Sequence, residues 1–156
     1  MQETNIYINY ELLNDDSFDT KNISAVLLRI VNEHKEMKLH VFSRETLFDK
    51  KGKLVDNRLP ESVAIEYLVV NSINNYKTNV GNTEVLLDNN TRTLRAWKEK
   101  GGVAIWYGDI KEAKNWDDLV IEPWLAYELL PFEIRMLTYN ISSRKYSTVK
   151  YRRDKG

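Results

Sequence analysis

"TEVLLDNNTRTLRAWKEKGGVAIWY", residues 83–107, is the stretch that decides the fold. The apolar run that ends at Asp88 predicts a buried strand over residues 83–88. Asn89 or Asn90 suits the N-cap of a following helix. Basic residues and a glycine suit the end of that helix, where the macrodipole and a left-handed cap favour them: Lys98, Lys100 and Gly101. Residues 103–107 are apolar enough for a strand buried on both faces, so a βαβ unit with parallel strands is predicted.

Strands and helices also alternate before this stretch. We expect a strand over Ile6–Leu12, a helix that starts near Thr20 and a second strand over Lys38–Phe42. The helix is predicted from five apolar residues spaced along one of its faces: Ile23, Val26, Leu27, Ile30 and Val31. "LFDKKGKLVD", residues 47–56, predicts a hairpin, because Asp-Lys-Lys-Gly separates two short β-capable pieces. A proline suits the first turn of a helix, so a helix is predicted from Pro60 to about Ile73, with Ala64, Tyr67 and Leu68 facing inward.

These elements predict an α/β fold, in which a parallel sheet is flanked by helices on both sides. Residues 120–156 differ from the rest, because two segments there predict an antiparallel hairpin: IRMLTYN (134–140) and KYSTVKYR (145–152). No repeat or linker divides the sequence. We therefore expect one domain over residues 1–156, with an α/β core over 1–119 and a C-terminal extension.

Composition narrows the functional classes. Hydrophobic residues make up 42% and charged residues 29%, which argues against a disordered chain and against a membrane protein. No apolar run approaches the ~20 residues that span a bilayer. The chain has no cysteine and only two histidines, so disulfides, thiolate nucleophiles and cysteine or histidine-rich metal sites are excluded. Its start, MQETNIY, lacks signal-peptide features, and a cytoplasmic location is expected.

Lys plus Arg equals Asp plus Glu, at 23 each, so no global charge attracts nucleic acid. Residues 144–155 are an exception, with six basic residues and one acidic residue. A solvated tail is the favoured interpretation. Tyr146 and Tyr151 lie among these charges and keep open the alternative of a nucleic-acid patch.

The strand ends are where a ligand site is expected, because ligands bind beyond the carboxyl ends of strands in open parallel sheets. The predicted ends carry Asn9-Tyr10-Glu11, Ser43-Arg44, Asp88-Asn89-Asn90 and Gly108-Asp109, and Lys77 precedes the third strand. Carboxylates suit Mg²⁺, whereas a lysine and a hydroxyl suit phosphate. A site for a phosphorylated ligand with a divalent cation is therefore predicted.

One long segment resembles a known family. "YKTNVGNTEVLLDNNTRTLRAWKEKGGVAIWYGD" (76–109) and "NWDDL" (115–119) are similar to segments of the haloacid dehalogenase (HAD) superfamily of phosphatases, in its 5'(3')-deoxyribonucleotidase-like branch. The resemblance is best over residues 76–119 and is only positional over 5–44. It implies a HAD-like, Rossmannoid sheet. The short segments between the strands leave room for a minimal cap or none.

The resemblance also implies roles for five residues. Ser43 and Lys77 match the phosphate-binding hydroxyl and lysine, and Asp88 matches an acidic Mg²⁺ ligand. Asn9 stands at the position of the nucleophilic aspartate, and Glu11 at that of the general acid and base. An amide is a poor nucleophile, and losing the nucleophile costs a factor of roughly 10⁴ or more in rate. The sequence therefore departs from the family at the bond-breaking residues.

The sequence is compatible with three functions. The first is a degenerate, nucleotidase-related domain that binds a nucleotide, a phosphorylated end or a protein partner without fast phosphatase activity. The second is a slow Mg²⁺-dependent phosphohydrolase that uses Glu11 and Asp88. The third is an interaction protein that works through its C-terminal basic hairpin. A purely structural role is the alternative to a functional role for each of these site residues, because polar residues often end strands and aspartate often begins a helix.

Overall fold

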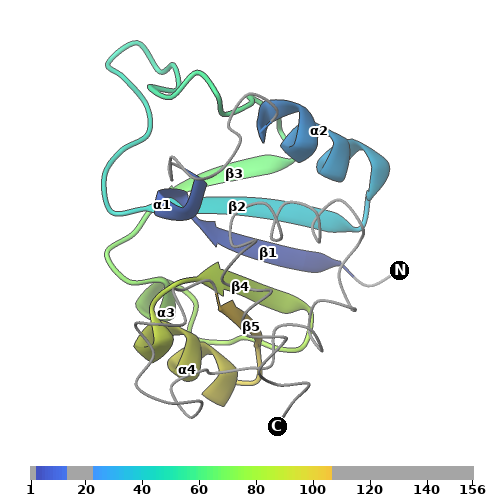
Figure 1. The fold of residues 1–156 in the computed structure, drawn as a ribbon, viewed down its shortest axis with the longest axis vertical. Helices are drawn as coiled ribbons and strands as arrows, with labels where there is room; N and C mark the ends of the chain where they lie inside the picture. The colour runs from blue at the N-terminus through green and yellow to red at the C-terminus, as the bar shows by residue number, and fades with distance from the viewer. Residues whose placement is uncertain (1–2, 14–22, 107–156) are drawn as a thin grey trace, which may run out of the picture.

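A five-stranded, all-parallel sheet is the centre of the molecule (Figure 1). It is seen in a computed structural model that describes residues 3–13 and 23–106. The strands are β1 (Thr4–Asn9), β2 (Met37–Ser43), β3 (Ile65–Val69), β4 (Glu84–Asp88) and β5 (Val103–Trp106). The helices are α1 (Tyr10–Leu13), α2 (Ile23–Glu33), α3 (Ile73–Tyr76) and α4 (Thr91–Glu99). The predicted Rossmann-like α/β fold is thus confirmed for this part of the chain.

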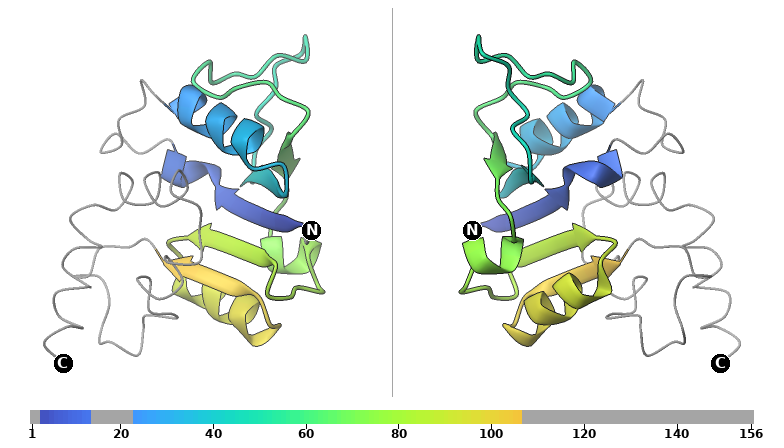
Figure 2. Two further views of the ribbon diagram at one scale, coloured as in Figure 1. Left: turned by 90° about the vertical axis from the view of Figure 1, so that its right-hand side faces the viewer. Right: turned by 90° about the vertical axis from the view of Figure 1, so that its left-hand side faces the viewer.

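The two faces of the sheet bury separate clusters of side chains. Ile6 and Ile8 of β1 pack into one cluster, which contains Leu27 and Ile30 of α2. Tyr7, between them, points the other way and packs into a second cluster with residues of α4. Figure 2 shows α2 near the β2 and β3 half of the sheet, and α4 near the β4 and β5 half. The strands therefore bury apolar side chains on both faces, as the continuous apolar runs predict.

The strand order, β3-β2-β1-β4-β5, creates a switch point between β1 and β4. From β1 the chain steps outward through β2 to β3, and it then returns to the other side of β1 to form β4. The connections after β1 and after β4 consequently leave in opposite directions. In doubly wound sheets this divergence opens a crevice at the carboxyl ends of the two strands. The order itself therefore positions a site between residues 9 and 88.

The helix expected from Pro60 to Ile73 is wrong, because β3 forms there and only the short α3 begins at its end. The sequence of β3, IEYLV, is rich in β-branched and aromatic residues, which favour a strand. Its side chains alternate, with Ile65 and Tyr67 facing the α2 cluster and Leu68 facing the α4 cluster. Pairing with β2 and burial on two faces outweigh the helical spacing of the apolar residues.

Other predicted boundaries hold approximately. The first strand ends at Asn9 rather than Leu12, because α1 follows it and buries Leu12 and Leu13. The hairpin predicted over residues 47–56 is reduced to one antiparallel bridge, Phe48 with Leu54. The helix start near Thr20, residues 107–119, the C-terminal hairpin and the basic segment 144–155 lie outside the described residues. No helix within the described ranges is long and apolar enough to cross a membrane.

The junction between α4 and β5 requires a residue without a side chain. Trp97 of α4 is fully buried, and its indole nitrogen donates to the Glu84 carbonyl at 3.2 Å. A Cβ atom on Gly102 would lie only 2.3 Å from that nitrogen. Trp97 also contacts the Tyr7 ring edge to face, at 5.3 Å between centroids. Glycine at 102 thus lets the chain turn directly under the tryptophan that anchors α4.

Gly102→Ala is expected to lower the free energy of unfolding by about 1–3 kcal/mol, because the methyl group overlaps a fully buried ring. Gly81→Ala is the matched control, since no atom lies within 4 Å of its added Cβ. The control is expected to change stability by less than about 1 kcal/mol. Urea unfolding of both variants measures the difference. Equal stability of the two variants would contradict the described packing of Trp97.

Candidate functional site

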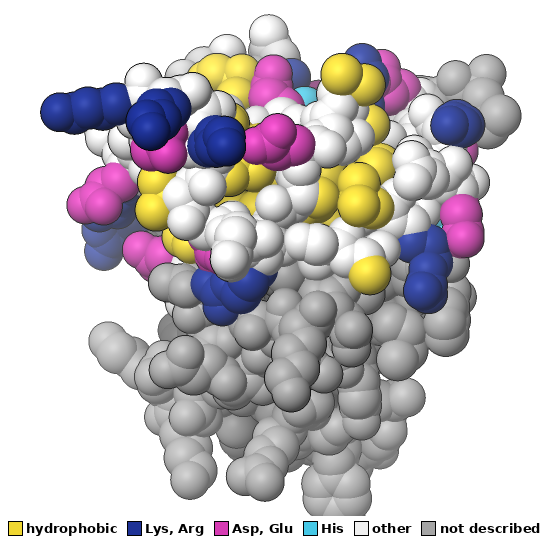
Figure 3. Space-filling view, turned by 90° about the horizontal axis from the view of Figure 1, so that it is seen from above, with side chains coloured by type: hydrophobic (Ala, Val, Ile, Leu, Met, Phe, Trp, Pro, Cys, Tyr) yellow, Lys and Arg dark blue, Asp and Glu magenta, His cyan; other side chains and the backbone are white. Residues whose placement is uncertain are grey.

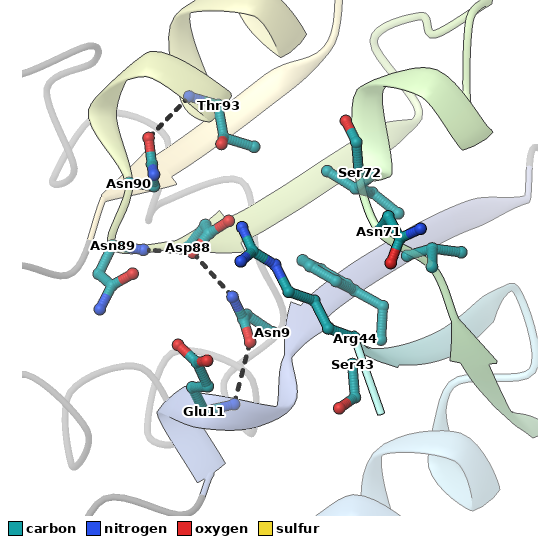
Figure 4. A pocket seen from close by; sticks show the side chains of 13 residues that line it. Asn9, Glu11, Ser43, Arg44, Asn71, Ser72, Asp88, Asn89, Asn90 and Thr93 are labelled. Atoms are coloured by element: carbon teal, nitrogen blue, oxygen red, sulfur yellow. Dashed lines mark hydrogen bonds between the residues drawn. The ribbon is translucent and has the colours of Figure 1, made fainter. Parts of the chain in front are cut away.

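A pocket of about 270 Å³ lies at the carboxyl ends of the strands (Figure 4). It is built by β1, β2 and β4, by the segment that leaves β3 and by the start of α4. Its lining is mostly polar: Asn9, Glu11, Phe42, Ser43, Arg44, Val70, Asn71, Ser72, Ile73, Asp88, Asn89, Asn90 and Thr93. The pocket is therefore where the switch point predicts a ligand.

The ends of β1 and β4 are joined by a side-chain hydrogen bond. The Asn9 amide nitrogen donates to Asp88 Oδ1 at 3.2 Å, and the Asn9 amide oxygen accepts from the Glu11 backbone N–H at 3.0 Å. These two partners fix the orientation of the amide, because a flipped amide would set its oxygen against a carboxylate and its N–H₂ against a backbone donor. Asn9 thus turns hydrogens, not a nucleophilic oxygen, toward Asp88.

Asp88 is the buried carboxyl group of the pocket, with 3% of its surface exposed. Burial raises the pKa of Asp88 above its ordinary value. Hydrogen bonds from the Asn89 backbone N–H, at 2.7 Å, and from Asn9 act in the opposite direction and stabilise the ionised form. The nearby Glu11 charge adds to the rise in pKa. A cation or another donor at the pocket would therefore relieve an unfavourable charge.

The start of α4 forms one wall of the pocket. Asn90 is the N-cap, and its side chain accepts from the Thr93 backbone N–H at 3.1 Å (Figure 4). This confirms one of the two caps predicted from the sequence. Asn89, Asn90 and Thr93 all line the pocket, so the positive end of a nine-residue helix borders it.

Ser43 and Arg44 come from the end of β2. The Ser43 hydroxyl accepts from the Glu45 backbone N–H at 3.2 Å and retains its own hydrogen for a ligand. Arg44 is exposed, and it forms no ion pair with another residue of the described ranges. Figure 4 shows its side chain reaching across the pocket from the Ser43 side. Among the described residues that line the pocket, Arg44 is the positively charged one.

Lys77 is not part of this lining. Its ammonium group pairs with the Glu84 carboxylate at 2.9 Å, and the Lys77 carbonyl accepts from the Lys100 ammonium at 2.6 Å. The structure therefore brings together four of the five residues singled out in the sequence: Asn9, Glu11, Ser43 and Asp88. It holds Lys77 in a separate ion pair, so the phosphate-binding role of this lysine stays a prediction.

Three polar lining residues are not among those predicted from the sequence: Asn71, Ser72 and Thr93. Asn71 and Ser72 follow β3, where the sequence predicts a helix over residues 60–73 rather than a strand end. The signal that could have revealed them is the run of β-branched and aromatic residues in β3, followed at once by the polar Asn-Ser pair. Arg44 is among the strand-end residues predicted from the sequence, and its place in the lining is the structure's addition.

The pocket meets the minimum needed for a Mg²⁺ ion that arrives with its ligand. Its carboxylates are Asp88 and Glu11, and no group of three metal-binding side chains gathers within residues 3–13 and 23–106. Mg²⁺ is commonly held by one or two carboxylates together with substrate phosphates and water. The donor set therefore suits a phosphate-bound cation better than a permanently bound one.

Helix α1, which carries Glu11, is anchored from outside the pocket. The Tyr10 hydroxyl donates to Asp56 Oδ2 at 2.7 Å, and Arg58 Nε donates to Asp56 Oδ1 at 2.8 Å. The Arg58 guanidinium holds the pKa of Asp56 at about 2. Because Asp56 stays ionised at neutral pH, it fixes the first turn after β1 and with it the backbone of residues 10 and 11.

Comparisons with protein-family models, with curated proteins and with solved structures find no match for this chain. The fold is accordingly described as Rossmann-like α/β, without a family.

Asn9→Asp is expected to lower the free energy of unfolding by about 1–3 kcal/mol at pH 7, because it places a second carboxylate against buried Asp88. The pair's pKa in the folded state rises above the unfolded value. The deficit is therefore present at neutral pH and shrinks as the pH falls toward about 4. Added Mg²⁺ should raise the Tm of this variant more than that of the wild type.

Asn71→Asp is the matched control, because it adds the same charge to the lining without a described contact to Asp88. Thermal unfolding from pH 4 to 8, with and without Mg²⁺, compares the two variants. A pH-dependent loss of the same size in both would show that the Asn9–Asp88 contact has no special electrostatic role.

Proposed function

We propose that this pocket binds the terminal phosphoryl group of a nucleotide or another phosphorylated ligand, together with Mg²⁺, and has little or no hydrolytic activity. The observation that carries the proposal is the convergence of Ser43, Arg44 and Asp88 on one polar pocket at the switch point of the sheet. Kinship with the HAD superfamily, in its nucleotidase-like branch, is part of the proposal. It is supported by the pocket positions of Asn9, Glu11, Ser43 and Asp88.

Arg44 and Ser43 are the proposed phosphate ligands. A guanidinium group binds phosphate oxygens through paired N–H donors, and Arg44 has no described ion pair that would compete. The Ser43 hydroxyl is adjacent and adds a neutral donor. The positive end of α4 borders the same space and favours an anion. Arg44 thereby takes the charge-neutralising role that the resemblance assigns to Lys77.

Asp88 is the proposed cation ligand. The buried carboxylate would repel a phosphate directly, so the two groups need a cation between them. A bound Mg²⁺ would supply that neutralisation. Asn89 and Asn9 donate to the same oxygen, Oδ1, which fixes how the carboxyl group is turned. The chain's own contribution is thus to orient one carboxylate for a cation brought by the ligand.

Asn9 is the reason for proposing binding rather than turnover. Covalent phosphoryl transfer to an aspartate needs a carboxylate oxygen aimed at phosphorus, and the amide presents N–H₂ to Asp88 instead. Replacing an obligatory nucleophile removes roughly four orders of magnitude or more of rate. Glu11 also lines the pocket, which supports the second candidate, a slow Mg²⁺-dependent phosphohydrolase that works through this carboxylate.

The proposal is tested by titrating the full chain with 5'-dTMP in Mg²⁺ by calorimetry. Arg44→Ala should weaken binding about tenfold or more, because a charged hydrogen bond contributes about 1.5–3 kcal/mol. Asp88→Asn should abolish the Mg²⁺ dependence. Lys77→Gln, which can still hydrogen-bond to Glu84, is the control and should leave the affinity within about twofold. Absence of binding to the wild type, or an equal loss in the lysine variant, would contradict the proposal.

A further inference from the structure

The loop that connects β2 to β3 carries a basic turn close in sequence to the pocket. Residues 44–58, RETLFDKKGKLVDNR, contain five Lys and Arg residues and three Asp and Glu residues, although the whole chain is balanced. Lys50, Lys51 and Lys53, here called the lysine turn, are all exposed. None of the three forms an ion pair with another described residue. Their charges are therefore available to a partner.

The shape of the lysine turn is fixed by hydrogen bonds from its backbone to Asp49. Asp49 Oδ1 accepts from the backbone N–H groups of Lys51, at 2.8 Å, and Lys53, at 2.9 Å. Gly52 has a positive φ of 81° and donates to the Asp49 carbonyl at 3.0 Å. The bridge between Phe48 and Leu54 closes the turn. Three cationic side chains are thus held on a preformed support rather than on an irregular loop.

The lysine turn and the pocket are close enough to meet one extended ligand. Arg44 lines the pocket, and Lys50 follows six residues later, a distance of at most about 22 Å along an extended chain. Figure 3, seen from the end of the molecule that carries this loop, shows exposed Lys and Arg side chains on both margins, with Asp and Glu side chains among them. Even at the 3.4 Å per phosphate of a strand in a duplex, a polyanion that starts in the pocket could therefore reach the turn within about seven phosphates.

We propose that the ligand of this pocket is the phosphorylated end of a single-stranded nucleic acid, whose next phosphates bind the lysine turn. This inference rests on the proposed function. The pocket, at about 270 Å³, is smaller than the ~300–1,000 Å³ of typical ligand sites, so it accepts a terminal phosphoryl group and part of one nucleotide. A single strand fits this opening better than a duplex end, which presents two strands side by side.

The test compares oligothymidylates of about ten nucleotides that carry a phosphate at the 5' end, at the 3' end or at neither end. Each has a fluorophore away from the tested end, and anisotropy is measured at about 50 and 200 mM salt. Two double variants remove equal charge: Lys50→Gln with Lys51→Gln at the turn, and Lys35→Gln with Lys38→Gln near the opposite end of β2. Binding of 5'-dTMP is measured in parallel.

A terminal phosphate should tighten binding about tenfold. The turn variant should weaken oligonucleotide binding severalfold and leave the affinity for dTMP unchanged. The slope of log affinity against log salt concentration should fall in magnitude by about 1.4, at ~0.7 for each lysine. The control variant should change neither affinity.

Three results would overturn the inference: equal effects of both double variants, no effect of the terminal phosphate, or displacement of the oligonucleotide by polyglutamate as readily as by DNA. If dTMP itself fails to bind, the proposed function is contradicted as well. If dTMP binds but the oligonucleotide binds no more tightly, only the further inference is contradicted.

Discussion

The hydrogen bond between Asn9 and Asp88 is the interaction on which the site depends, because it links the ends of β1 and β4 at the switch point of the sheet. Asp88 is almost fully buried at that position, and an isolated buried carboxylate would be costly. The Asn9 amide and the Asn89 backbone N–H provide its donors. A neutral amide at position 9 therefore lets two strand ends meet without the repulsion that two carboxylates would create in the absence of a cation.

The Asn9–Asp88 hydrogen bond joins two strand ends but uses an amide at the position where the resemblance places a nucleophilic carboxylate. With its N–H₂ group turned toward Asp88 and its oxygen hydrogen-bonded to the Glu11 backbone, the Asn9 side chain offers no carboxylate oxygen to a phosphoryl group. In the proposed function, the ligand is recognised by Ser43, Arg44 and the start of α4, which all line the pocket. The elements around the pocket are held in place from both faces of the sheet. Trp97 anchors α4 through its hydrogen bond to the Glu84 carbonyl, and Asp56 anchors α1 through its hydrogen bond from Tyr10. The function proposed on this basis is binding of a phosphorylated ligand with little or no hydrolysis.

The sequence predicted the second half of the fold best, because β4, α4 and β5 combine clear apolar runs with an N-cap at Asn90 and a glycine end. It failed at β3, where the spacing of Ala64, Tyr67 and Leu68 fits a helix although pairing with β2 decides the outcome. Four predicted site residues meet because parallel strand ends share one edge. Lys77 does not join them, because its ammonium group pairs with Glu84, at the opposite end of β4 from Asp88.

The most direct test of phosphate binding at the switch point is an NMR titration of the ¹⁵N-labelled chain with 5'-dTMP and Mg²⁺. We expect chemical-shift changes of the Asn9 side-chain amide and of the Asn89 and Asn90 backbone amides. The Arg44 side-chain signal should change over the same range of ligand concentration. The Lys77 backbone amide should stay in place. Shifts centred on Lys77, or a spectrum unchanged by ligand and metal together, would contradict a phosphate site at the switch point.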